Sequence, residues 1–287
     1  MTDVVISIVF DGLAYAMLLF VISVGLSVTM GLMGFINLAH GAFAMAGGYA
    51  VTSLTGGLGL PYPLALLAAA VIVGVASVPV ERLLYARVYA ARELDQVMLT
   101  IGLVFMAIAG FTFFYGPSPQ TLQLPSYLTG QIDLGFRSFP TFRAVVIGIG
   151  LVLIAVLWFG FERTGFGARI RAAVDNRTMA QVVGIDVDRL FMITFAVGSG
   201  LAALGGGVAV EMLGVSPVFA AQYLVYFLIV VAVGGLGSIK GAFFAALVLG
   251  IVDNAGKYLW PDGGAFFIYA LTLALLLVRP QGLAGRS

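Results

Sequence analysis

The segment ERTGFGARIRAAVDNRTMAQVVGIDVDR, residues 162–189, is the only long polar stretch in an otherwise apolar chain. It holds nine of the 27 charged side chains that the 14 Lys and Arg and the 13 Asp and Glu supply, and five of the nine are arginines. An arginine or aspartate at the centre of a bilayer costs roughly 2.5–3.5 kcal/mol. The segment therefore lies in water, and its arginines place it on the cytoplasmic side.

Residue patterns within this segment predict two short helices. Residues 166–174 are helix formers, with Ile170, Ala173 and Val174 on one face. The turn between the two helices is expected at 175–176. Such an amphipathic element suits docking to another protein, and the alternative is a plain solvated loop.

The second helix has a predicted start and a predicted end. Thr178 and Gln181 fit a capping box, in which the two side chains satisfy free N–H groups at a helix start. Gly184 is expected to be the residue just after the helix that ends it. The polar segment is therefore expected to be structured.

Composition sets the class of protein. The chain is 61% hydrophobic and 9% charged, with a mean hydropathy of +1.11, whereas soluble proteins average roughly 25% charged residues. Its apolar runs of about 20 residues favour membrane helices over a β-barrel. No cysteine is present, and one histidine without a carboxylate cluster argues against a metal site. A net charge of +1 gives no argument for nucleic acid, and no cofactor is expected.

Runs of apolar residues predict an all-α, polytopic bundle with about nine membrane spans. The spans are expected at 5–30, 34–54, 63–85, 95–115, 142–161, 190–212, 220–237, 241–258 and 264–279. With the N-terminus outside and the C-terminus inside, 11 of the 14 Lys and Arg fall in inner loops. A re-entrant pair around 234–241 would reduce the number to eight. The first span lacks a preceding Lys or Arg and is expected to stay as a membrane helix.

The chain is therefore expected to form a single transmembrane domain over residues 1–287, with the cytoplasmic loop 162–189 and an outer loop at 116–140. The outer loop carries four prolines, which predict a structured connection without a long helix. It is either part of a docking face for an extracytoplasmic partner or a simple connector.

Two glycine-rich breaks interrupt the apolar runs. The first, residues 31–49, contains Asn37 and His40 three positions apart, which would place them on one helix face. Polar groups in such a run face the protein interior or water. They either mark a substrate path or make a hydrogen bond that fixes helix packing, and the residue chemistry favours the hydrogen bond.

The second break, residues 234–243, again has G-x-x-G followed by Gly-Ala-Phe, which hints at an internal repeat. Its glycines are expected to allow a tight turn.

Asp253 and Lys257 can pair because they are four residues apart. The stretch 250–258 resembles a phosphate-binding loop, but its spacing is one residue too long and Tyr258 replaces Ser or Thr.

Three motifs, occurring in this order, together resemble one family. GLMGFINLAHGAFAMAGGY (31–49), ARIRAAVDNRTMAQVVGIDVDR (168–189) and GGLGSIKGAFFAALVLG (234–250) are similar to the LivH-type permease subunit of bacterial branched-chain amino acid ABC importers. The likeness runs over nearly the whole chain. Ala42 departs from an acidic residue common in the family, and Lys240 departs from a proline. These departures leave open whether the solute is a branched-chain amino acid, urea, an amide or another small acid.

The resemblance implies a transport subunit, not an enzyme, in the bacterial inner membrane. Its expected partners are a LivM-like second permease, two cytoplasmic ATP-binding subunits and an extracytoplasmic solute-binding protein. Coupling to the ATPase is then expected from Arg171, Ala172, Asp175, Asn176, Met179, Ala180, Gly184 and Ile185. A substrate pathway is expected from Asn37, His40, Gly41, Gly47, Gly48 and Glu211. A glycine-rich hinge is expected from Gly234, Gly235, Gly237, Ser238 and Gly241.

An alternative function is a secondary transporter driven by an ion gradient. It is motivated by four polar residues near or within predicted spans, which are His40, Glu211, Asp253 and Lys257.

Overall fold

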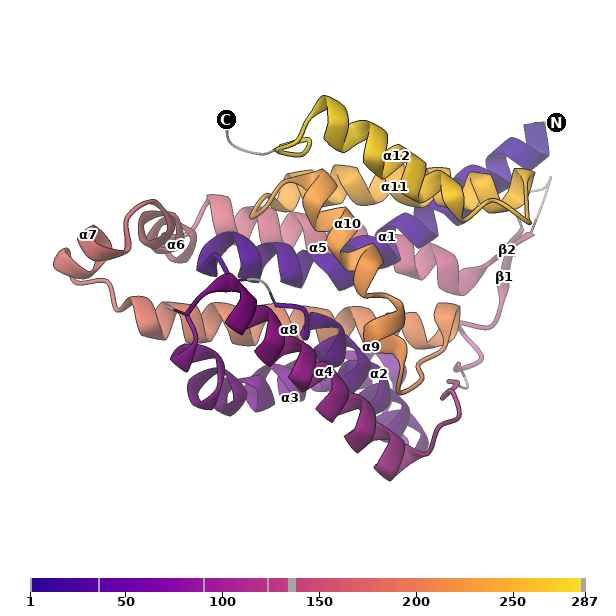
Figure 1. Ribbon diagram of the computed structural model, residues 1–287. Coiled ribbons are helices and arrows are strands. Elements are labelled where there is room, and N and C mark those ends of the chain that lie inside the picture. Colours follow the sequence, from indigo (N-terminus) through magenta and orange to yellow (C-terminus); the bar gives the residue numbers. More distant parts are fainter. Residues whose placement is uncertain (1, 36, 90, 123, 134–137, 285–287) are drawn as a thin grey trace.

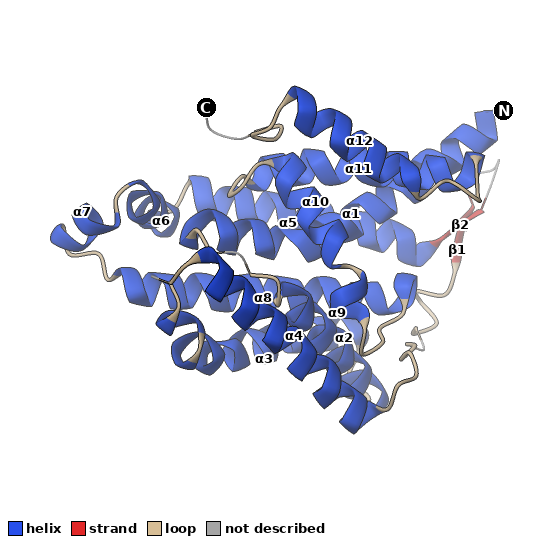
Figure 2. Ribbon diagram, in the orientation of Figure 1, coloured by secondary structure: helices blue, strands red, loops and turns tan. Residues whose placement is uncertain are grey.

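The computed structural model describes residues 2–35, 37–89, 91–122, 124–133 and 138–284, which are helical almost throughout (Figures 1 and 2). The helices are α1 (Thr2–Met33), α2 (His40–Gly56), α3 (Tyr62–Leu83), the 3₁₀ turn η1 (Tyr85–Arg87), α4 (Glu93–Tyr115), α5 (Thr141–Glu162), α6 (Gly165–Asp175), α7 (Arg177–Val182), α8 (Val187–Leu213), α9 (Phe219–Gln222), α10 (Leu224–Gly234), α11 (Ile239–Leu259) and α12 (Phe266–Val278). Two short strands, β1 (Gln131–Asp133) and β2 (Ser138–Pro140), pair antiparallel.

All nine predicted apolar segments coincide with helices, but they differ in length. Within the described residues, six helices are long and apolar enough to cross a membrane, namely α1, α3, α4, α5, α8 and α11. At 17 and 13 residues, α2 and α12 extend only about 25 and 20 Å, less than the roughly 30 Å of a bilayer core. The predicted helix over 220–237 corresponds to the apolar helical segment Phe219–Gly234, which a bend at Tyr223 divides into α9 and α10.

Helix α8 lies at the centre and packs against α1, α2 and α3. Glycine and alanine make this possible: a Cβ added at Gly206 would collide with the backbone of Ala44, and one added at Gly47 would collide with Ala203. Small residues at an interface let membrane helices approach closely. The α2–α8 contact is therefore made nearly backbone to backbone.

Helices α1 and α11 form a second close pair. A Cβ at Gly250 would meet Ala16 Cα at 2.5 Å, and one at Gly12 would meet Ile251 Cα at 3.0 Å. The outer helices are different, since α4 exposes Phe105, Met106, Phe113 and Phe114. Exposed apolar side chains of this density suit lipid or another membrane subunit.

The two ends of the bundle carry different features. In Figure 1, α6 and α7 lie at the left end, where the C-terminal segment also lies, and the N-terminus lies with β1 and β2 at the right end. The predicted outer loop is a connection without a long helix, as expected: besides the two strands, Gln120 pairs with Val215. Its positions 123 and 134–137 lie outside the described residues.

Candidate functional site

Helices α6 and α7, with the residues up to Ile185, form a compact unit at one end of the bundle (Figure 1), here called the coupling element after the role predicted for it. Thr164 caps α6 by accepting a hydrogen bond from the Gly167 N–H at 3.4 Å. The predicted capping box of Thr178 is wrong. Asn176 is the N-cap of α7 and accepts from the Met179 N–H at 3.0 Å, because the amide side chain at the turn satisfies the helix start two residues earlier.

The end of α7 agrees with its prediction. Gly184 has φ +87°, a conformation that favours glycine. Its N–H donates to the Gln181 carbonyl at 3.0 Å, and the N–H of Ile185 donates to the Ala180 carbonyl at 2.9 Å. These two bonds form a Schellman motif, which turns the chain sharply from α7 towards α8.

The coupling element has a small core of its own. Ile170, Ala173 and Ala180 are buried there against three residues at the start of α8. Ala180 therefore does not present a side chain to a partner, contrary to its predicted place among the contact residues. Val174, predicted on the buried face, is 41% exposed, because the core is narrow and α6 has only one row of residues facing it.

The outer surface of the coupling element is polar with an apolar tip. Ala172, Asp175, Asn176 and Gly184 are exposed, as predicted for contact residues, and Ile185 is partly buried. Arg171 is exposed as well, and its guanidinium donates to the carbonyl oxygen of Phe161 on α5.

Three apolar side chains make up the tip. Met179, Val182 and Val183 are 60%, 75% and 73% exposed. Of the three, only Met179 was predicted as a contact residue; the pair Val182 and Val183, apolar within the polar segment, was the sequence signal for the other two. Water-exposed apolar groups gathered at one end of a molecule mark an interaction surface.

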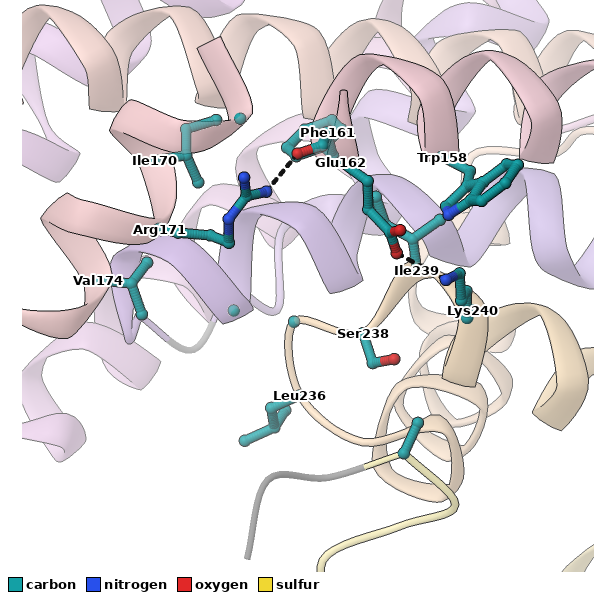
Figure 3. Close-up of a pocket in the computed structure, with 14 residues that line it drawn as sticks. Trp158, Phe161, Glu162, Ile170, Arg171, Val174, Leu236, Ser238, Ile239 and Lys240 are labelled. Carbon is teal, nitrogen blue, oxygen red and sulfur yellow. Dashed lines mark hydrogen bonds and ion pairs between the residues drawn. The ribbon is translucent and has the colours of Figure 1, made fainter. Parts of the chain in front are cut away.

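The glycine-rich turn between α10 and α11, residues 234–241, lies beside the coupling element (Figure 3). Gly235 and Gly237 have φ of 93° and 77°, which confirms the predicted tight turn. Ser238 caps α11 by accepting from the Gly241 N–H at 2.9 Å. Gly241 in turn packs against the carbonyl group of Gly234, where a Cβ would collide.

The turn and the coupling element enclose a cavity of about 390 Å³ (Figure 3). Glu162, at the end of α5, forms an ion pair with Lys240 at 2.8 Å. The Lys240 ammonium also lies 5.0 Å from the centre of the Trp158 ring. Gly31 of the first break contacts Gly237 here, so the two glycine-rich breaks meet at one end of the bundle.

Asn37 and His40 do not share a helix face, because α2 begins only at His40. The Tyr85 hydroxyl donates to Asn37 Oδ1 at 2.9 Å, and His40 Nε2 donates to the Ile22 carbonyl at 2.8 Å. Both side chains are buried. In this conformation each side chain makes a hydrogen bond that fixes packing, the role that the residue chemistry favoured, and the bond of His40 joins α2 to α1.

Of the other predicted pathway residues, the three glycines are buried in close contacts and Glu211 is exposed near the end of α8. Gly41 lies against Ala220 of α9, and a Cβ there would be 3.0 Å from Ala220 Cα. His40 and Gly41 therefore adjoin the α9–α10 break. Glu211 does not lie with them. The His40 ring lies close to Gly25, which packs against Gly198 of α8, and Glu211 is about 20 Å further along α8 from Gly198.

The α9–α10 break is a feature that sequence reasoning missed. Gln222, at the end of α9, is exposed, and Tyr223 interrupts the helix within an apolar segment. The polar Gln-Tyr pair inside a predicted span was the available signal. In transporters, solute sites often lie at discontinuities of membrane helices.

Asp253 and Lys257 form the predicted pair, with Lys257 Nζ 2.5 Å from Asp253 Oδ2. Asp253 is fully buried, and its second oxygen has no hydrogen-bond partner among the described residues. The Lys257 ammonium lies 5.3 Å from the Tyr15 ring centre. Within the described part of the chain, no group of three His, Asp or Glu side chains could hold a metal ion.

Comparison with known proteins gives a consistent result. The family model described as branched-chain amino acid transport system / permease component matches residues 8–276. The permease protein LivH of the high-affinity branched-chain amino acid transport system of Escherichia coli K12 is 27% identical, over 96% of this chain and 94% of LivH. The corresponding protein BraD of Pseudomonas aeruginosa gives the same values. A probable LivH of Methanocaldococcus jannaschii is 25% identical, over 94% of this chain and 90% of that protein.

Proposed function

Since this chain belongs to the family of permease components of branched-chain amino acid transport systems, we propose that it pairs with a second, LivM-like permease to enclose the solute path of an importer. It is a transport subunit of an ABC system and not an enzyme. Such systems include ATP-binding subunits and a solute-binding protein. ATP hydrolysis therefore takes place on the ATP-binding subunits and not on this chain.

The observation that supports coupling of this chain to an ATP-binding subunit is the apolar tip of the coupling element. Met179, Val182 and Val183 project into water at the end of the bundle that holds the five arginines of residues 162–189. Burying each of these side chains in a groove of an ATP-binding subunit would contribute roughly 1 kcal/mol or more. The exposed polar residues Asp175 and Asn176 would lie at the rim of that contact.

A cysteine crosslink tests this docking. The chain has no cysteine, so Met179→Cys introduces a single thiol at the tip, and Leu58→Cys, also strongly exposed but between α2 and α3, is the matched control. In the assembled importer, a short crosslinker with one maleimide end and one photoreactive end is expected to link Met179→Cys to an ATP-binding subunit and to give no such link from Leu58→Cys. Equal crosslinking of the two variants would refute the docking assignment.

Motion of the coupling element has two routes into the membrane domain. Arg171 ties α6 to the end of α5, and the Schellman turn at Gly184 joins α7 to α8, the central helix. Closure of an ATP-binding dimer would displace the coupling element and, with it, α8. The turn with Gly234, Gly235, Gly237, Ser238 and Gly241 would act as the hinge beside it, since its glycines tolerate changes of φ.

The solute path is proposed to run along the two helix discontinuities. Helix α2 starts beside Ile22, well inside the bundle, and α9 ends next to it at Gln222. Discontinuous helices supply unpaired backbone groups to solutes in transporters. Asn37 and His40 would hold this region in place, while Gly41, Gly47 and Gly48 would allow helices to slide in close contact. Glu211 would lie at the outer entrance.

An aliphatic amino acid is the proposed solute, because the relatives named above are branched-chain amino acid permeases. The alternative of an ion-driven transporter is not favoured. Asp253 is neutralised by Lys257, and His40 is engaged with a backbone carbonyl. Family membership accounts for transport without an ion relay.

The proposed topology has nine crossings, with the N-terminus outside and the C-terminus inside, in the bacterial inner membrane. The opposite ends on which the two termini lie support an odd number of crossings (Figure 1). The arginines of the coupling element support the inner position of that end. Helix α2 would complete a crossing together with the segment that precedes it. Helices α9 and α10 would complete another crossing together.

A further inference from the structure

The cavity between α6 and the glycine-rich turn has the size and the chemistry of a ligand site (Figure 3). Its volume of about 390 Å³ falls within the roughly 300–1,000 Å³ of small-molecule sites. The docking of α7 into a partner does not require it. Its lining combines both signs of charge with aliphatic side chains.

The charged part of the lining is an ion pair that a ligand can open. Glu162 and Lys240 are 2.8 Å apart, with side chains 46% and 51% exposed. Ion pairs this exposed contribute at most about 1 kcal/mol. A ligand that offers a cation to Glu162 and an anion to Lys240 therefore replaces the pair at little cost. Arg171, from α6, adds a second cation to the lining.

The apolar part of the lining comes from α6 and from the turn. Val174 and Leu236, the latter 65% exposed, line the cavity together with the buried Ile170. Aliphatic groups at a water-filled cavity gain about 25 cal/mol for each Å² that a ligand covers. All three side chains line the same cavity and offer it an aliphatic surface.

We propose that this cavity is a cytoplasmic binding site for an α-amino acid with an aliphatic side chain. The ligand ammonium binds Glu162, its carboxylate binds Lys240 and Arg171, and its side chain packs on Val174 and Leu236. A phosphate or another simple anion fits less well, because the Glu162 carboxylate repels it.

The location of the site gives it a regulatory role, which rests on the proposed function. A ligand there bridges the coupling element and the turn next to Gly237. Accumulated solute on the cytoplasmic side would then hold the two together and oppose the displacement that drives transport. Binding itself depends only on the cavity.

Calorimetry on the purified full-length chain in lipid nanodiscs, without ATP or partner subunits, tests the site. The probes are L-leucine, glycine, 4-methylpentanoate (no ammonium) and 3-methylbutylamine (no carboxylate). Loss of one charged hydrogen bond or of the aliphatic contact is expected to weaken binding at least about tenfold relative to L-leucine.

Two variants then identify the location. Glu162→Gln is expected to weaken L-leucine binding at least about tenfold but to retain 4-methylpentanoate binding. Lys240→Met is expected to weaken L-leucine binding but to retain 3-methylbutylamine binding. Arg169→Gln is the control, since Arg169 is exposed on α6 and does not line the cavity. A variant that merely misfolds would lose every probe and would not show this exchange of preference.

The proposal is overturned if the wild-type chain binds no L-leucine, or if L-leucine binding is the same in Glu162→Gln and Lys240→Met as in Arg169→Gln. Binding elsewhere in the chain, such as in the solute path, gives the second result. No ATP-binding subunit is present in the assay. A failed crosslink at Met179→Cys would therefore refute the docking function and leave this binding site standing. Conversely, a successful crosslink without L-leucine binding would support docking and refute this site.

Discussion

Asp253 is the clearest example of how one residue constrains a membrane protein. Its side chain, on α11, is fully buried, and one carboxylate oxygen is bonded to Lys257 at 2.5 Å. A buried charge without its partner is costly, whereas replacing both members by neutral groups is often harmless. The pair is therefore expected to matter for assembly and not for proton transfer.

A double-variant cycle checks this at the residue scale. Lys257→Met is expected to destabilise the chain by up to about 3 kcal/mol, since it leaves the Asp253 carboxylate alone, and Asp253→Asn in the same chain should restore most of the loss. Thermal unfolding in detergent measures the four variants side by side. Transport that depends on the charge of Asp253 even in the stable double variant would favour the ion-driven alternative.

At the scale of elements, α7 shows why a short helix can be formed without being buried. It has a cap at Asn176, a Schellman motif at Gly184 and one buried residue, Ala180. The remaining apolar side chains face water. Local hydrogen bonds hold the helix in place, so its outer surface is free for a partner.

Replacement of Met179, Val182 and Val183 together by serine should separate the two roles of α7. The thermal stability of the chain is expected to change by less than about 0.5 kcal/mol, because exposed side chains contribute little. Affinity for the ATP-binding subunit is expected to fall at least about 100-fold, as roughly 3 kcal/mol of apolar burial is lost. Pull-down of the subunits at graded concentrations measures it. The double change Arg163→Ser and Arg169→Ser provides a control with exposed polar positions of the same segment.

At the scale of the whole molecule, the asymmetry of the two ends decides orientation. Basic residues gather around α6 and α7, while the opposite end has the strands and few cations. The positive-inside rule acts on this difference during insertion. The bundle is expected to have one orientation only.

Single thiols report the orientation directly. In intact spheroplasts that express this chain without its ATP-binding subunits, a membrane-impermeant maleimide is expected to label Leu58→Cys and to leave Met179→Cys unlabelled until the membrane is opened. Both positions are exposed in the protein, so the bilayer alone accounts for the difference. The opposite labelling pattern would place the coupling element outside and would contradict the proposed topology.

The sequence by itself determined the membrane class, the approximate positions of the apolar helices and the coupling element. These follow from local properties: run length, charge and residue spacing. The pairing of Asp253 with Lys257 and the stop at Gly184 also follow from the immediate neighbours of each residue. Glycine at 235 and 237 likewise allowed the turn to be predicted.

Only the tertiary structure decided the partners of Asn37 and His40, the break at Tyr223 and the cavity beside Lys240. Asn37 bonds a residue 48 positions away, His40 one 18 positions away, and Glu162 one in the distant α11. Periodicity within one segment contains no information on such neighbours. They depend on which helices the small residues of α8 allow into contact, because close packing and hydrogen-bond geometry are properties of the assembled bundle.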